Sequence, residues 1–223
     1  MPLHPNQHAY QAGKFMETAL HQLVVQVEKA LDQHETYLGV FLDIEGAFNN
    51  TCYNTMCDAL VRHGSDYTIV QWIWYTLESC MAVATLKGFS VRLAISRGCL
   101  QGGVLLPILW CLVVDDLLAR LNGSGVFIQG HADDICVLTV GIFPNTVSGL
   151  MQWALSTLQT WCNKVGLSVN PDKTGLVTFT RKRKLKGFSE PQFFGVKLSL
   201  SGSVKYLGFI LDCRLTWREH VEV

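Results

Sequence analysis

Two adjacent acids, Asp133 and Asp134, are the residues of this chain whose types and spacing are best suited to chemistry. They lie between two strand-like apolar runs, 126–129 and 135–140. Neighbouring carboxylates repel each other, so such a pair between apolar strands is expected where a cation neutralises it. Carboxylate oxygens suit hard divalent cations, and magnesium is the cation that we predict.

A third acid, Asp43, follows the apolar run 37–42, which predicts a buried strand that ends in a carboxylate. A βαββαβ order of elements brings Asp43 beside the hairpin acids on one antiparallel sheet edge. Three carboxylates there can hold two cations about 3.5–4 Å apart, which activates an attacking oxygen and stabilises a leaving pyrophosphate. We therefore predict nucleotidyl transfer with two Mg²⁺ ions, for which Mn²⁺ can substitute. Asp43, Asp133 and Asp134 are the predicted catalytic metal ligands.

The two hairpin acids are not expected to be equivalent, because side chains alternate along a strand. We predict Asp133 as the primary ligand together with Asp43, and Asp134 as a weaker ligand or one that acts through water. A second pair, Asp115-Asp116, falls within an expected helix. Adjacent acids are common on helix surfaces, so we predict no chemistry for that pair.

The elements that must position these acids follow from the spacing of apolar residues and from turn-forming residues. The predicted elements are helices over 16–34, 47–63, 66–79, 107–121 and 145–165, a hairpin over 81–95, and strands over 174–180, 193–200 and 204–211. The hairpin is expected to turn at Lys87-Gly88, and Gly166 is expected to end the last helix.

The composition is that of a globular protein without an overall charge. Its 223 residues are 49% apolar, enough for one large domain or two small ones. Equal numbers of basic and acidic residues, 18 each, mean that any nucleic-acid binding must be local. The eight cysteines form no CxxC pair, which favours buried thiols in a reducing compartment over zinc ligation. We find no signal peptide and no apolar run that could span a membrane, so an intracellular protein with no membrane partner is expected.

One run of positive charge stands out, and it comprises Arg181, Lys182, Arg183, Lys184 and Lys186. Two interpretations of it stay open. It is either a solvated loop or a contact to a phosphate backbone.

The segment Phe41-Leu42-Asp43-Ile44-Glu45-Gly46-Ala47-Phe48 resembles polymerase motif A. With the motifs below, it makes the chain similar to the reverse transcriptases of non-LTR retrotransposons, especially jockey-like and rDNA-inserting insect elements. This resemblance runs from about His4 to the end of the chain. It implies that Phe48 lies under the nucleotide sugar as a steric gate against a 2′-hydroxyl. The alternative is an ordinary core phenylalanine at the start of a helix.

Two further motifs follow in the family's order. The glycine-bearing loop before the helix at 107 resembles motif B, which implies substrate-binding roles for Gln101, Gly102 and Gly103. Glycine suits such a loop because it lets the backbone approach a ligand. The sequence Asn-Pro-Asp-Lys-Thr resembles motif D, in which Lys173 matches the lysine proposed to protonate the departing pyrophosphate. A lysine that is merely solvated is the alternative.

The ends of the chain also resemble family segments. The C-terminal part is similar to motif E, the primer-grip hairpin, which implies nucleic-acid contacts for Tyr206, Leu207 and Gly208. The N-terminal part is similar to a fingers segment, in which Lys14 would contact the template or the triphosphate.

The resemblance implies an α+β fold: a polymerase palm with a ferredoxin-like (RRM-like) βαββαβ antiparallel sheet, helices on one face, and partial fingers. It implies a single partial domain that lacks the outer fingers and the thumb. Its expected parts are partial fingers over 1–36, a palm over 37–180 with an insertion at 65–100, and a basic loop with the grip-like hairpin over 181–223. The implied partners are an RNA template, a DNA primer and dNTPs, the thumb and endonuclease being missing from this chain. Action in the nucleus is also implied.

Several positions depart from the family pattern. Leu100 and Leu106 replace the usual proline and serine of motif B, and His131 stands where motif C has tyrosine, phenylalanine or a small residue. These changes keep a second hypothesis open, namely a catalytically inactive retroelement remnant that at most binds RNA. A third hypothesis is another palm-type enzyme such as a nucleotide cyclase, although motifs B and D argue against it.

Overall fold

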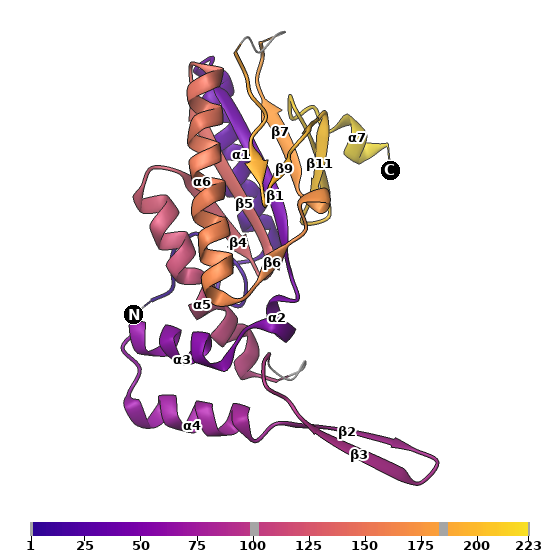
Figure 1. Cartoon of the computed structure of the whole chain (residues 1–223). Helices are drawn as coiled ribbons and strands as arrows, with labels where there is room; N and C mark the ends of the chain where they lie inside the picture. Colours follow the sequence, from indigo (N-terminus) through magenta and orange to yellow (C-terminus); the bar gives the residue numbers. More distant parts are fainter. Residues whose placement is uncertain (1, 99–102, 183–186, 223) are drawn as a thin grey trace.

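The computed structural model describes residues 2–98, 103–182 and 187–222. Figure 1 shows a long central sheet flanked by helices, with two shorter helices and a projecting hairpin below it. Within the described residues, the helices are α1 (Met16–Asp32), α2 (Ala47–Asn50), α3 (Tyr53–Arg62), α4 (Tyr67–Glu78), α5 (Leu105–Gly123), α6 (Pro144–Val165) and α7 (Arg218–Val221), with a 3-10 turn η1 (Pro171–Lys173).

The strands are β1 (Thr36–Glu45), β2 (Met81–Leu86), β3 (Phe89–Ala94), β4 (Phe127–His131), β5 (Asp134–Gly141), β6 (Ser168–Val169), β7 (Gly175–Phe179), β8 (Gln192–Phe193), β9 (Val196–Lys197), β10 (Leu200–Ser201), β11 (Ser203–Tyr206) and β12 (Phe209–Asp212). The main sheet has the order β10-β7-β1-β5-β4, with β6 paired to the end of β1. Its β1, β4, β5 and β7 pair antiparallel, and β10 pairs parallel to β7. The βαββαβ order and the α+β palm fold are confirmed.

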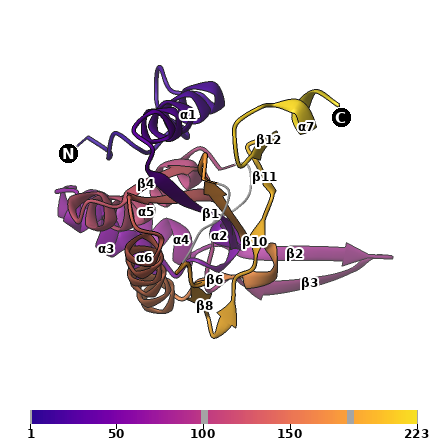
Figure 2. The ribbon, with the colours of Figure 1, turned by 90° about the horizontal axis from the view of Figure 1, so that it is seen from above.

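Successive side chains of β1 point to opposite faces of the sheet, which divides the core into two layers. Leu38, Val40 and Leu42 pack with buried residues of α3, α5 and α6. Tyr37 and Phe41 point to the other face and pack with buried residues of α1 and of the β11–β12 hairpin. Figure 2 shows this from above, with α1 on one side of the sheet and α5 and α6 on the other. The palm helices therefore share one face, as expected, while the N-terminal helix and the C-terminal hairpin cover part of the opposite face.

The helix boundaries follow local chemistry. Pro144 starts α6, where its missing N–H costs no hydrogen bond, and Gly166 ends the helix in the left-handed conformation. Pro107 lies in the first turn of α5, as expected. None of the helices in the described part of the chain is long and apolar enough to cross a membrane.

Three predicted elements are wrong in detail. The helix expected over 47–63 is broken into α2 and α3, because Cys52 is extended and forms an isolated β-bridge with Arg97. The strands expected over 193–200 and 204–211 are divided into the short strands β8 to β12. Positive φ at Phe194-Gly195 and at Leu207-Gly208 turns the chain inside each predicted strand.

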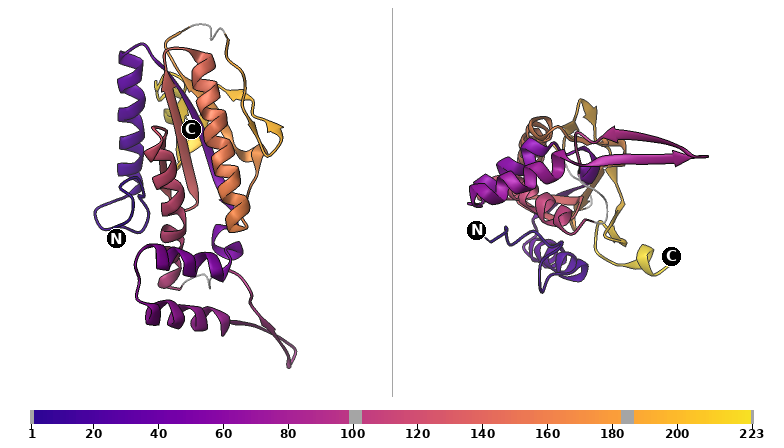
Figure 3. Two further views of the ribbon diagram at one scale, coloured as in Figure 1. Left: turned by 60° about the vertical axis from the view of Figure 1, so that its left-hand side comes forward. Right: turned by 90° about the horizontal axis from the view of Figure 1, so that it is seen from below.

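The hairpin predicted over 81–95 is confirmed as β2 and β3. Its turn lies at Lys87-Gly88, and both residues have positive φ, as the tightest hairpin turns require. Every side chain of the two strands is exposed. Figure 3 shows the hairpin extending away from the rest of the chain beyond α4.

Candidate active site

The three predicted carboxylates all lie at one end of the sheet. Asp43 and Asp134 are direct partners in the antiparallel register of β1 and β5, two residues beyond the pair of Phe41 and Cys136. Directly opposed residues place their side chains on the same face, so both acids lie on the face that carries α1. Asp133 lies in the two-residue turn between β4 and β5, and its carbonyl accepts a hydrogen bond from Ile44 N at 3.2 Å.

The pKa values of two of these acids are raised, in part by the charges of their neighbours. Partial burial, followed by the charges of Asp133 and Asp43, raises the pKa of Asp134 to about 6. Burial and then the charge of Asp133 also raise the pKa of Asp43, which the positive charge of Lys173 opposes. Each of these carboxylates is therefore in a field of excess negative charge that a divalent cation would cancel.

The carboxylates fit a divalent cation by donor chemistry and by register. Carboxylate oxygens are the ligands that Mg²⁺ prefers. Within the described residues, however, no three His, Cys, Asp or Glu side chains converge into a metal-ligand group. The ligand roles of Asp43, Asp133 and Asp134, and the order of preference between the last two, stay predictions.

The raised pKa of Asp134 predicts a pH-dependent stability. The folded chain holds this proton more tightly than the unfolded chain, so the free energy of unfolding falls as pH rises from about 4 through about 6. Asp134→Asn should flatten this dependence and raise the melting temperature near pH 7 by a few degrees. Thermal unfolding without divalent cations, measured across this pH range, checks it. The exposed Asp58 provides the control, since Asp58→Asn should keep the wild-type slope; an unchanged slope for Asp134→Asn would contradict the prediction.

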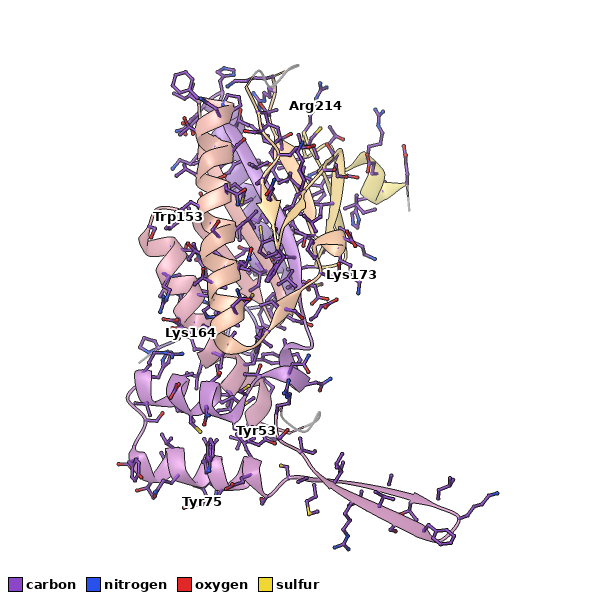
Figure 4. The ribbon with its side chains drawn as sticks, in the orientation of Figure 1. Tyr53, Tyr75, Trp153, Lys164, Lys173 and Arg214 are labelled. Carbon is purple, nitrogen blue, oxygen red and sulfur yellow. The ribbon has the colours of Figure 1, made fainter. Side chains whose placement is uncertain are left out.

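Lys173 lies beside the acids because the edge of the sheet is interrupted there. β7 pairs with β1 up to Phe41, and β6 pairs with it again from Ile44, so η1 lies next to the stretch that contains Asp43. Asn170 caps this turn by accepting a hydrogen bond from the Asp172 N–H at 2.9 Å. Figure 4 shows Lys173 at this edge of the sheet. The structure thus places Lys173 near enough to Asp43 for its charge to act on that carboxylate, and its role toward pyrophosphate stays a prediction.

The predicted sugar gate lies on the short helix that follows β1. Phe48, on α2, is half-buried and packs its ring against Trp110 of α5, with ring centroids 5.8 Å apart. Gly103 is exposed just before α5. Gln101 and Gly102, the other predicted substrate-binding residues, lie outside the described residues.

Lys14 has a different environment from the one predicted. Its ammonium group donates hydrogen bonds to the carbonyls of Pro5 and Gln7, the latter at 2.9 Å. Gln7 in turn bridges to Gly130, so this part of the N-terminal segment extends the sheet beside β4. Lys14 therefore holds that segment next to the acidic hairpin, a role that its position in the sequence did not indicate.

Asp115 was expected on a helix surface, and this is wrong. Its carboxylate accepts a hydrogen bond from the His4 backbone N–H and lies 3.3 Å from His63 Nε2, with only 14% of the side chain exposed. Asp116 is also partly buried, and it pairs with Arg120 one turn later. The N-terminal segment covers Asp115, and helical periodicity alone does not show such a cover.

The basic run has partners within the chain at its described positions. Arg181 forms an ion pair with Asp32 at 3.0 Å, and the Lys182 ammonium donates to the Ile142 carbonyl at 2.8 Å. Arg183 and Lys184 lie outside the described residues. Arg181 and Asp32 are both largely exposed, so their ion pair is weak and leaves Arg181 able to meet a phosphate.

The grip-like hairpin is attached to the palm by a few buried side chains. Tyr206 is 3% exposed, packs on Phe41 with ring centroids 5.1 Å apart, and its hydroxyl accepts a hydrogen bond from Gln129 Nε2. Leu207 is also buried, whereas Gly208 is exposed in the turn. Direct contact with nucleic acid is therefore available to Gly208, while Tyr206 and Leu207 attach the hairpin to the palm.

Comparison with known proteins assigns this arrangement. Residues 1–211 match the family described as "Reverse transcriptase (RNA-dependent DNA polymerase)". The chain belongs to the reverse transcriptase family. The palm carboxylates, the interrupted sheet edge with Lys173 and the Phe48 position are thus features of a reverse transcriptase domain, and the nucleotide cyclase alternative loses its support.

The reverse transcriptase domain is similar to insect retrotransposon proteins. It is 26% identical, over 97% of its length, to "Probable RNA-directed DNA polymerase from transposon BS" of Drosophila melanogaster. It is 30% identical, over 91% of its length, to "RNA-directed DNA polymerase from mobile element jockey" of Drosophila funebris. These relatives are of the non-LTR kind, as the sequence motifs predicted. The chain spans 24% and 22% of their respective lengths.

Solved structures support the fold. The chain superimposes on apo telomerase from Candida Tropicalis, truncated from the C-terminal domain, with a TM-score of 0.68 over 95% of this chain and 40% of that chain. The sequence identity is 11%, so this likeness shows the polymerase palm fold alone.

Proposed function

We propose that this reverse transcriptase domain performs RNA-templated DNA synthesis by nucleotidyl transfer, adding dNTPs to a primer 3′-hydroxyl. The observation that carries the proposal is the register of Asp43 opposite Asp134, with Asp133 in the adjoining turn and Lys173 beside Asp43. A telomerase of the same fold has been solved with a fragment of telomeric RNA, which supports RNA as the template.

The proposed roles follow from the chemistry of each group. Asp43 and Asp133 would hold two Mg²⁺ ions, with Asp134 contributing more weakly. When bound, the ions lower the pKa of the attacking hydroxyl and neutralise the developing phosphate charge. Lys173, whose positive charge acts on Asp43, would hold a proton for the departing pyrophosphate.

Substrate selection is assigned to Phe48 and the motif B loop. Phe48 is backed by the buried Trp110, so its ring has little freedom to move away from a sugar hydroxyl. Gly103 is exposed at the loop's described end, where it leaves room for a nucleotide.

The test is primer extension by the 223-residue chain, with a labelled DNA primer on an RNA template, dNTPs and MgCl₂. Incorporation that requires both the RNA template and the divalent cation supports the proposal. Binding of the primer–template without incorporation would instead support a catalytically inactive domain. One set of observations favours that second candidate, because Lys14, Arg181 and Lys182 already have partners within the chain.

A smaller side chain at position 48 should weaken the discrimination between dNTPs and rNTPs. Phe48→Val opens the space that the ring fills, so the ratio of kcat/KM for dNTPs to that for rNTPs should fall about 10- to 100-fold. Steady-state single-nucleotide incorporation measures this ratio. Phe127→Val is the matched control. Phe127 is also half-buried, but it lies at the end of β4 that is away from Asp133 and Asp134. An unchanged ratio in Phe48→Val would overturn the gate assignment.

A further inference from the structure

The backbone of the turn that carries Asp133 is held from two sides. Ala132 has a φ of 56°, a left-handed conformation that residues with a Cβ rarely adopt. Its carbonyl accepts a hydrogen bond from the indole Nε1–H of Trp110 at 2.8 Å. The next carbonyl, that of Asp133, accepts from the Ile44 N–H at 3.2 Å. Two consecutive peptide groups of the turn are therefore fixed, one from α5 and one from β1, which is the condition under which such a conformation persists.

Trp110 reaches this turn from within the core. It is 2% exposed, and one side of its ring packs against Phe48. A hydrocarbon ring of similar size could provide that packing without any polar group. The indole N–H adds a donor that would be costly to bury unpaired, and within the described residues it donates to the Ala132 carbonyl. One side chain thus contacts both the predicted sugar gate and the predicted metal-binding turn.

We propose that Trp110 is a positioning residue, whose hydrogen bond to the Ala132 carbonyl orients the Asp133 carboxylate for divalent cations while its ring seats Phe48. The physical reason is adjacency, because the Ala132 carbonyl belongs to the peptide group that leads into Asp133. Rotation of that peptide would redirect the Asp133 side chain. The inference rests on the proposed function, in which these carboxylates bind the cations.

The test compares Mn²⁺ binding by the 223-residue chain and by variants, measured from the EPR signal of free Mn²⁺. Trp110→Phe keeps an aromatic ring against Phe48 and removes only the donor. It should weaken Mn²⁺ binding about 3- to 10-fold, as the loss of one hydrogen bond implies. Trp161→Phe is the matched control, since Trp161 is buried to a similar extent on α6 and packs in the same core cluster. That control should bind Mn²⁺ like the wild type even if its melting temperature falls as much as that of Trp110→Phe.

The outcomes separate the two proposals. If Asp133→Asn binds Mn²⁺ as tightly as the wild type does, the proposed function itself is overturned. If Asp133→Asn reduces binding but Trp110→Phe and Trp161→Phe both match the wild type, the site stands and the role of Trp110 is wrong. A Trp110→Phe loss that Trp161→Phe reproduces would likewise assign Trp110 to general core packing.

A measurement on the unaltered chain covers the case in which Trp110→Phe does not fold. If the cation and the Trp110 hydrogen bond favour the same turn conformation, each must stabilise the other. Mg²⁺ should then slow hydrogen exchange of the Trp110 indole N–H by about 3- to 10-fold, while that of Trp161 stays the same. Equal exchange of the Trp110 indole with and without Mg²⁺ would overturn the inference.

Discussion

Asp133→Asn is expected to reduce magnesium-dependent primer extension by about 10³-fold or more, because the variant loses a charged ligand at the point where phosphate charge develops. Asparagine has nearly the same shape as aspartate and suits a turn. The backbone carbonyl at this position keeps its hydrogen bond from Ile44 N. The fold should therefore remain while the activity is lost.

The stability of the same variant provides an internal check. Removing one negative charge from beside Asp43 and Asp134 relieves the repulsion that raises their pKa values. The melting temperature without divalent cations should stay level or rise, whereas a variant that lost activity by unfolding would melt earlier. Asp58→Asn, which alters an exposed acid on α3, should retain full activity. Undiminished extension by Asp133→Asn would sink the assignment of the site.

Gly98→Ala is expected to destabilise the chain by about 2–5 kcal/mol, the sum of a left-handed backbone cost and an overpacking cost. Gly98 has a φ of 76°, and a Cβ there would lie 2.4 Å from the backbone oxygen of Asn49. The Gly98 N–H also donates to the Thr51 carbonyl at 2.8 Å. This glycine therefore allows the start of the motif B loop to lie directly against the segment that follows motif A.

Gly125→Ala is the matched control for that prediction. Gly125 has a similar φ of 80° but no atom within 4 Å of a built Cβ, so only the backbone cost of about 1–2 kcal/mol applies. Chemical denaturation of both variants measures the difference, which isolates the contact with Asn49. Equal losses in the two variants would show that this close approach contributes nothing to stability.

Local patterns were sufficient to predict most of the elements that position the site. The apolar runs beside Asp43 and beside the hairpin acids predicted three of the sheet strands, and Gly166 predicted the end of α6. These signals depend on residues close together in the chain, where periodicity determines which side chains can be buried together. The C-terminal strands were predicted too long because the positive φ at Phe194 and Leu207 falls inside apolar runs.

Local patterns were not sufficient for contacts between distant segments. The hydrogen bonds from Lys14 to the carbonyls of Pro5 and Gln7 were not predicted, and its contact with a template or a triphosphate stays a prediction. Asp115 was predicted on a surface, yet the N-terminal segment and His63 cover it. The contact of His4 with Asp115 depends on where the N-terminal segment crosses the palm, and no spacing of residues in the sequence encodes that crossing.

The sequence by itself determined which residues are predicted to supply the chemistry, because Asp43, Asp133 and Asp134 occur in strand-forming contexts whose order indicates a palm. Only the tertiary structure decided how these groups meet. Antiparallel register placed Asp134, and not Asp133, directly opposite Asp43, since a shift of one residue would send each side chain to the other face. Helix packing then brought Trp110 to the Ala132 carbonyl, a contact that depends on where α5 crosses the sheet.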